Sequence, residues 1–146
     1  MRRAVRGIVF HDNKMLVMQR NKFGNQYCTL PGGGVDIDET PEQALYRELQ
    51  EETGLSIGKS RQVFMEHAGE PYGTQYVYLV DYLGGEPAIQ PHATEAKINA
   101  LGKNLYQPAW LPIDELNASN FLSERLKKAI VASIKNGFPE KVIELA

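Results

Sequence analysis

The chain has 146 residues, 42% of them hydrophobic and 23% charged, which is the composition of an ordinary folded domain. Its net charge of −2 argues against a binder of polymeric nucleic acid, which usually carries a basic surface. The single cysteine, Cys28, excludes an intrachain disulfide and a cysteine-based metal site. No signal sequence opens the chain and no apolar run is long enough for a membrane span, so we expect one cytoplasmic domain over residues 1–146.

The first third of the chain reads as strands and turns. Residues 3–21 predict two strands joined at Asp12, Asn13 and Lys14, because apolar strand formers lie on both sides of a turn-forming pair. Residues 26–37 predict a short strand that ends at Pro31 and three glycines. Alone, such a glycine run indicates only a tight turn or a close approach of the backbone.

A helix is predicted from about Pro41 to Thr53. Thr40 suits its N-cap, Pro41 the first helical position, and Gln43 completes a Thr-x-x-Gln capping box. Gly54 suits a left-handed C-terminal stop. The ends of this helix are therefore well defined by sequence.

The remaining elements follow in chain order. Residues 63–85 predict a second hairpin, and 84–108 a long polar loop that we expect to close over a substrate. Residues 108–116 predict a short strand and a helical start. Residues 121–137 predict an amphipathic helix that ends at Gly137, with a core stripe at helical spacing formed by Leu122, Leu126, Ile130 and Ile134.

The carboxylates of the central helix are placed unusually. At 100° per residue, Glu48, Glu51 and Glu52 share the side of Ala44 and Leu45. A solvated charge stripe would lie opposite the aliphatic residues. We therefore expect these glutamates to face the body of the protein, where clustered carboxylates are suited to Mg²⁺ or Mn²⁺.

The segment 33–55, "GGVDIDETPEQALYRELQEETGL", resembles the Nudix box of the Nudix hydrolases, in a MutT-like form. All nine fixed positions of that motif are filled, by Gly33, Glu39, Arg47, Glu48, Leu49, Glu51, Glu52, Gly54 and Leu55. The resemblance implies the α/β (α+β) class and a Nudix-type α/β/α sandwich with a mixed β-sheet. It also implies an enzyme that uses Mg²⁺ or Mn²⁺ to hydrolyse a nucleoside diphosphate linked to another moiety.

The resemblance also implies roles for single residues. Glu48, Glu51 and Glu52 would bind metal, with a backbone oxygen from Gly32 or Gly33. Glu52 or Glu48 would act as the base, and Arg47 would hold a neighbouring carboxylate, either Glu51 or Glu39. An acidic ligand from the later loop is expected at Glu95, with Glu86 in reserve. The expected substrate-binding residues are Arg20, Gly33, Gly34 and Glu39.

The substrate stays open at this point. A (d)NTP-type nucleotide that gives NMP and pyrophosphate is the first expectation, and a nucleotide sugar or dinucleotide is the alternative. Pro71 and Tyr72 stand where the family relates such residues to ADP-ribose or diadenosine polyphosphates, but "GEPYGT" also reads as a plain turn. A non-catalytic sensor is the third hypothesis. We expect a small-molecule nucleotide as partner, no polymeric nucleic acid and no membrane, with a homodimer left open.

Overall fold

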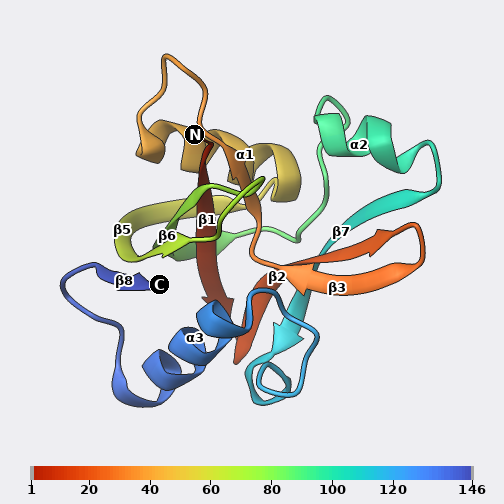
Figure 1. Ribbon diagram of the computed structural model, residues 1–146. Coiled ribbons are helices and arrows are strands. Elements are labelled where there is room, and N and C mark those ends of the chain that lie inside the picture. Colours follow the sequence, from red (N-terminus) through yellow and green to blue (C-terminus); the bar gives the residue numbers. More distant parts are fainter. Residues whose placement is uncertain (1, 146) are drawn as a thin grey trace.

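The computed structural model describes residues 2–145, which form a mixed β-sheet with helices on both sides (Figure 1). The strands are β1 (Arg3–His11), β2 (Lys14–Lys22), β3 (Asn25–Thr29), β4 (Gly32–Gly34), β5 (Ser56–His67), β6 (Thr74–Gly84), β7 (Asn104–Pro112) and β8 (Ile143–Leu145). The helices are α1 (Pro41–Thr53), α2 (Thr94–Asn99), the 3-10 turn η1 (Ile113–Glu115) and α3 (Glu124–Asn136).

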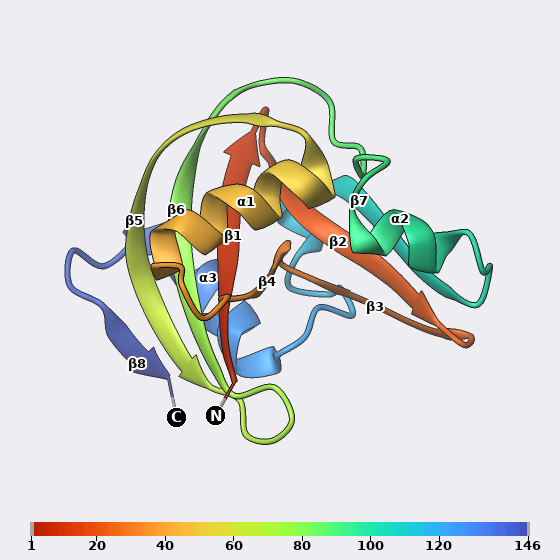
Figure 2. The same ribbon diagram turned by 90° about the horizontal axis from the view of Figure 1, so that it is seen from above.

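The sheet has the strand order β3-β2-β1-β6-β5-β8, with β4 paired to β1 and β7 paired to β2. β1 runs parallel to β6 and antiparallel to β4, so the sheet is mixed. β2 pairs with both β3 and β7, and these three strands extend away from α1 as an arm (Figure 2). The predicted mixed sheet is confirmed.

Two apolar cores lie on opposite faces of the sheet. The first joins the sheet to α1 and includes Val5, Val9, Leu45 and Leu49. The second joins it to α3 and includes Ile8, Phe64, Phe121, Leu126 and Ile130. β1 contributes to both cores because successive side chains point to opposite faces of a strand. The α/β/α sandwich expected from the sequence is therefore confirmed.

The predicted central helix is confirmed at both ends. The Thr40 side chain accepts from the Gln43 amide, the Gln43 side chain accepts from the Thr40 amide, and Gly54 is left-handed at φ 64°. The first turn of the sheet is confirmed as well, since Asp12 and Asn13 both have positive φ between paired His11 and Lys14. Local capping and turn chemistry fixes these elements without help from the rest of the fold.

Two expectations were wrong. Residues 84–108 are not one loop, because α2 lies within them and β7 begins at Asn104. The N-cap position of α2 is Ala93, which makes no capping bond, and β7 is held by its pairing with β2, which is distant in sequence. Leu122 is not part of the apolar stripe: it precedes the Ser123 N-cap of α3 and is 51% exposed.

Candidate active site

The inward-facing carboxylates of α1 meet the glycine strand β4. Glu48 and Glu52 are buried, whereas the Glu51 side chain is 27% exposed. The Gly32 amide donates to Glu52 Oε2 at 2.7 Å. The helix thus presents two buried carboxylates to the backbone of a strand, on the side that the 100° spacing predicted.

β4 requires glycine at two positions, because a side chain at either would clash with neighbouring atoms. Gly32 has φ 148°, and a Cβ there would lie 1.9 Å from the Val5 carbonyl oxygen. A Cβ on Gly33 would lie 2.5 Å from Cδ of Glu48. Because real Cβ contacts are never so short, any side chain at position 33 must displace the Glu48 carboxylate. The glycines therefore allow the helix carboxylates to approach the backbone.

Arg47 connects the carboxylates on the exposed side of the site. Its guanidinium makes a two-bond contact with Glu39, with Nε to Oε2 at 2.6 Å and Nη2 to Oε1 at 2.8 Å. Nη1 donates to Glu48 Oε1 at 2.9 Å and lies 3.6 Å from Glu51 Oε2. Nη2 also donates to the Gly34 carbonyl at 3.1 Å. Arg47 thus pairs with both carboxylates expected from the sequence and with Glu48 in addition.

The two buried glutamates differ in environment from Glu39. Burial raises the pKa of Glu52 to about 8, although Arg6 and the Gly32 amide oppose this effect. Burial also raises the pKa of Glu48, with Arg47 opposing. The Arg47 contact lowers the pKa of Glu39 to about 2. Burial therefore favours the protonated form of Glu52, whereas the Arg47 contact favours the ionised form of Glu39.

Arg6 is a site residue that our sequence reasoning missed. It lies on β1, donates to Gln75 Oε1 at 2.9 Å and to the Leu30 carbonyl at 3.2 Å, and interacts electrostatically with Glu52 and Glu48. Burial lowers the pKa of Arg6 from its usual value, and Glu52 counteracts this. A charged residue within the apolar strand "AVRGIVF" was the signal that could have identified it.

The segment after β6 brings Glu95 to the carboxylates. The Ala88 amide donates to the Thr53 carbonyl and the Gln90 amide to the Glu51 carbonyl, both at 2.9 Å, so this segment caps the C-terminal end of α1. Glu95 follows in the first turn of α2 and raises the pKa of Glu48 and of Glu52 by its charge. Glu86 is exposed, and no contact described within residues 2–145 joins it to these glutamates.

The donor set has the chemistry of a site for Mg²⁺ or Mn²⁺. Oε1 of Glu95 is buried and has no hydrogen-bond partner, and the charge of Glu95 raises the pKa of the buried Glu48 and Glu52 carboxyls. Hard carboxylate oxygens are the ligands that these ions prefer. Within residues 2–145, no group of three or more histidine, cysteine, aspartate or glutamate side chains is spaced to hold one ion. The carboxylates of Glu48, Glu52 and Glu95 are thus chemically suited to bind the metal. Their side chains would have to change rotamer to reach a common ion.

Arg20 lies beside this acidic group, on the arm. Its guanidinium is stacked 3.6 Å from the centre of the Tyr106 ring and donates to Tyr27 Oη at 3.2 Å and to the Leu105 carbonyl at 3.1 Å. Charges from Glu95 and Glu52 act on the Tyr106 hydroxyl, whose pKa is raised chiefly by burial. A planar cation and two aromatic rings thus adjoin the carboxylates.

These features define an α/β/α protein in which helix carboxylates face a glycine strand, with two arginines as counter-charges. The family model described as the NUDIX domain matches residues 1–131. The chain therefore belongs to the Nudix family. In the part that the structure describes, no helix is long and apolar enough to cross a membrane.

Three known proteins illustrate what the chain is similar to. An ADP-ribose pyrophosphatase of Methanocaldococcus jannaschii is 37% identical over 99 residues, which cover 64% of this chain and 59% of that protein. The NAD-capped RNA hydrolase NudC of Escherichia coli O1:K1 / APEC is 29% identical over 105 residues, covering 72% and 37%. The crystal structure of a Streptococcus suis ADP-ribose pyrophosphatase superposes with a TM-score of 0.66 at 23% identity, covering 98% and 96%, which shows the fold. The chain thus spans about 60% or less of these two sequence relatives.

Proposed function

We propose that this protein is a metal-dependent pyrophosphohydrolase whose substrate is a (d)NTP-type nucleotide, cleaved to NMP and pyrophosphate. The observation that carries the proposal is the buried pair Glu48 and Glu52 beside Glu95, whose buried Oε1 lacks a partner. Buried carboxylates without enough counter-charge are costly, and an enzyme can use them to bind a divalent ion.

The metal ligands in this proposal are Glu48, Glu51, Glu52 and Glu95, with a backbone oxygen of Gly32. A bound Mg²⁺ or Mn²⁺ would neutralise pyrophosphate oxygens and lower the pKa of a bound water. Glu52 is the base that we assign, and Glu48 is the alternative, because both carboxylates are buried against β4, where a positioned glutamate can take the proton of the attacking water. Water then attacks one phosphorus, and the other phosphate leaves with the bonding electrons.

Arg47 and Glu39 act as positioning residues. Both Glu39 oxygens contact Arg47, and Oε1 also accepts from the Asp36 amide at 2.9 Å. This leaves Glu39 little capacity for the substrate contact that we expected, so we assign it to holding Arg47 against Glu48. Gly33 supports the same geometry by leaving room for Glu48.

The nucleoside is assigned to the arm. Arg20, Tyr27 and Tyr106 offer a stacked cation and two rings next to the carboxylates, which suits the base or sugar of a nucleotide. Gly34 stays a proposed substrate-binding residue, and its carbonyl also accepts from Arg47. Arg20 is accordingly proposed to bind the nucleoside part of the substrate, as we expected from the sequence.

A second candidate substrate is ADP-ribose or a related nucleotide conjugate. The Methanocaldococcus relative named for that activity shares 37% identity over 99 residues, and this similarity favours it. A non-catalytic sensor is disfavoured, because all four box glutamates are present.

A substrate panel with Mg²⁺ tests the proposal. Purified protein is given the eight common (d)NTPs, ADP-ribose and diadenosine tetraphosphate, and products are separated by chromatography. Formation of NMP with pyrophosphate from a (d)NTP supports the first candidate, whereas AMP with ribose phosphate from ADP-ribose alone supports the second. No turnover of any substrate, from protein that binds nucleotide, would overturn the enzymatic proposal and favour the sensor.

A further inference from the structure

The short helix α2, which carries Glu95, has no packed side chain to hold it in place. None of the six residues from Thr94 to Asn99 is buried, and the N-cap residue, Ala93, makes no side-chain bond. A helix this short is not stable in water on its own. α2 therefore needs contacts with the rest of the fold to keep it in one orientation.

The side chain of Asn99 joins α2 to β7, the strand on which this helix packs. Asn99 Nδ2 donates to the Tyr106 carbonyl at 2.8 Å, and Asn99 Oδ1 accepts from the Tyr106 amide at 2.7 Å. An asparagine side chain offers both an acceptor and a donor, so it pairs with a strand residue much as a neighbouring strand would. Asn99 thus fastens the last turn of α2 to the backbone of one residue of the sheet.

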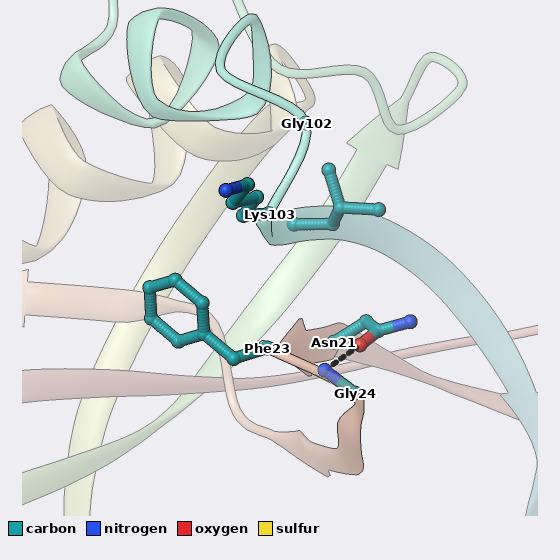
Figure 3. Close-up of a pocket in the computed structure, with 6 residues that line it drawn as sticks. Asn21, Phe23, Gly24, Gly102 and Lys103 are labelled. Carbon is teal, nitrogen blue, oxygen red and sulfur yellow. Dashed lines mark hydrogen bonds between the residues drawn. The ribbon is translucent and has the colours of Figure 1, made fainter.

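Tyr106 is a well-fixed point of attachment. It is paired with Arg20 of β2 in the sheet, and its ring centre lies 3.6 Å from the Arg20 guanidinium carbon. The connection from α2 to β7 is short and contains Gly102 and Lys103 (Figure 3). The Gly102 amide donates to the Asn99 carbonyl at 2.9 Å, so this connection is a tight turn. Asn99 therefore links α2 to a part of the arm that other contacts already hold.

Glu95 and Asn99 lie on the same face of α2. They are four residues apart, and residues at this spacing are neighbours on a helix surface. Oε1 of Glu95 is buried and has no hydrogen-bond partner, so no bond of its own holds this oxygen in place. The segment before α2 is attached to α1, where the Gln90 amide donates to the Glu51 carbonyl at 2.9 Å. The direction of the Glu95 side chain thus follows the rotation of α2, which Asn99 sets at the other end.

We propose that Asn99 is a positioning residue, whose two bonds to Tyr106 fix the rotation of α2 and so hold Glu95 at the carboxylates of α1. The inference rests on the proposed function, in which Glu95 is a metal ligand. Asn99 touches neither metal nor substrate in this role. Residues that orient a ligand in this way are worth about 10–100-fold in metal affinity or activity.

Metal binding and kinetics in two variants test the proposal. Asn99→Ala and Asn99→Leu both remove the two bonds, and both introduce a better helix former, so a loss of helix propensity cannot cause the effect. Calorimetry with Mn²⁺ on metal-free protein should show binding about tenfold weaker in each variant, and kcat at saturating Mn²⁺ should fall about tenfold. KM for the nucleotide should change less than about twofold, because Arg20 and Tyr106 keep their pairing in the sheet.

Glu95→Gln separates a positioning role from a general structural one. If Asn99 acts through Glu95, adding Asn99→Ala to Glu95→Gln should weaken Mn²⁺ binding no further, because the two changes remove the same interaction. Asn120→Ala is the matched control: the Asn120 side chain also donates to a backbone carbonyl, that of Gln26 at 3.0 Å, and it lies outside α2. This control should leave Mn²⁺ affinity unchanged.

The outcomes separate the inference from the proposed function. Weaker Mn²⁺ binding and lower kcat with little change in KM, in both Asn99 variants, support the inference. Parent-like Mn²⁺ affinity in either variant, a further tenfold loss in the double variant, or an equal loss in Asn120→Ala would overturn it and leave the proposed function intact. A parent that neither binds Mn²⁺ nor hydrolyses any nucleotide would overturn the proposed function, and the inference with it.

Discussion

Glu52→Gln should lower turnover by orders of magnitude and yet stabilise the metal-free fold at neutral pH. The glutamine keeps the shape of the side chain and an oxygen for the Gly32 amide, which lies 2.7 Å from Glu52 Oε2. It removes the carboxylate that we assign as base, so turnover should fall by about 10²–10⁴-fold. The expected gain in stability has a different cause: the variant no longer has to bury the charge of the Glu52 carboxylate.

The magnitude follows from the raised pKa of Glu52. Its native pKa is about 8, against an ordinary value of 4.5. Below pH 4.5 the carboxyl is protonated in both states, and its contribution to stability is fully present. As pH rises towards 8 the unfolded state loses its proton first, so the free energy of unfolding decreases with pH. At pH 7 the loss is about 3 kcal/mol, from 1.36 kcal/mol per pH unit.

Thermal melting in EDTA from pH 4.5 to pH 9 measures this effect. The parent and Glu52→Gln should melt together near pH 4.5 and separate as pH rises, with the variant higher by about 2–4 °C per kcal/mol. Mg²⁺ should raise the parent's melting temperature more than the variant's, because it binds the charged carboxylate. Parallel melting curves at all pH values would refute the argument that a buried charge at position 52 opposes folding.

Four further substitutions test separate parts of the site. Gly33→Ala should lower turnover about 100-fold with little change in melting temperature, because the added Cβ would displace the flexible carboxylate end of Glu48. An unchanged kcat would show that catalysis does not need the Glu48 carboxylate beside Gly33. Arg47→Lys should lower activity about 10–100-fold, because lysine cannot make the two-bond contact with Glu39. If Arg47→Lys regained activity when Glu39 was also changed to Gln, Glu39 would not be the residue that positions Arg47. Glu95→Gln should weaken Mn²⁺ binding and lower kcat together, and a change in KM alone would remove Glu95 from the ligands. Tyr72→Ala should not change the preference among ADP-ribose, diadenosine tetraphosphate and dNTPs, because Tyr72 is 58% exposed in a turn. A selective loss of kcat/KM for one of these substrates would show that the turn recognises it.

The predictable features were those set by local chemistry. The capping residues Thr40, Gln43 and Gly54 fixed both ends of α1, and helical spacing alone turned Glu48 and Glu52 inward. These signals lie within a few turns of one helix, so they need no knowledge of the tertiary fold.

The features that escaped prediction depend on contacts distant in sequence. β7 exists because it pairs with β2, about 90 residues earlier, and α2 begins at Thr94 although its N-cap residue, Ala93, provides no side-chain cap. Arg6 reaches the carboxylates only because β1 lies under α1 in the folded chain. Pattern-based reading cannot supply such pairings, and tertiary contacts override local preference.

The dependence of turnover on bound metal decides whether the carboxylates of α1 form a metal-dependent catalytic site. Mn²⁺ is titrated into metal-free protein by calorimetry, while hydrolysis of the best (d)NTP is followed over the same concentrations. We predict no turnover in EDTA, turnover that rises in step with metal occupancy, and a folded Glu52→Gln protein whose turnover is about 10²–10⁴-fold lower at every Mn²⁺ concentration. Full turnover in EDTA, or a fully active Glu52→Gln protein, would contradict this prediction.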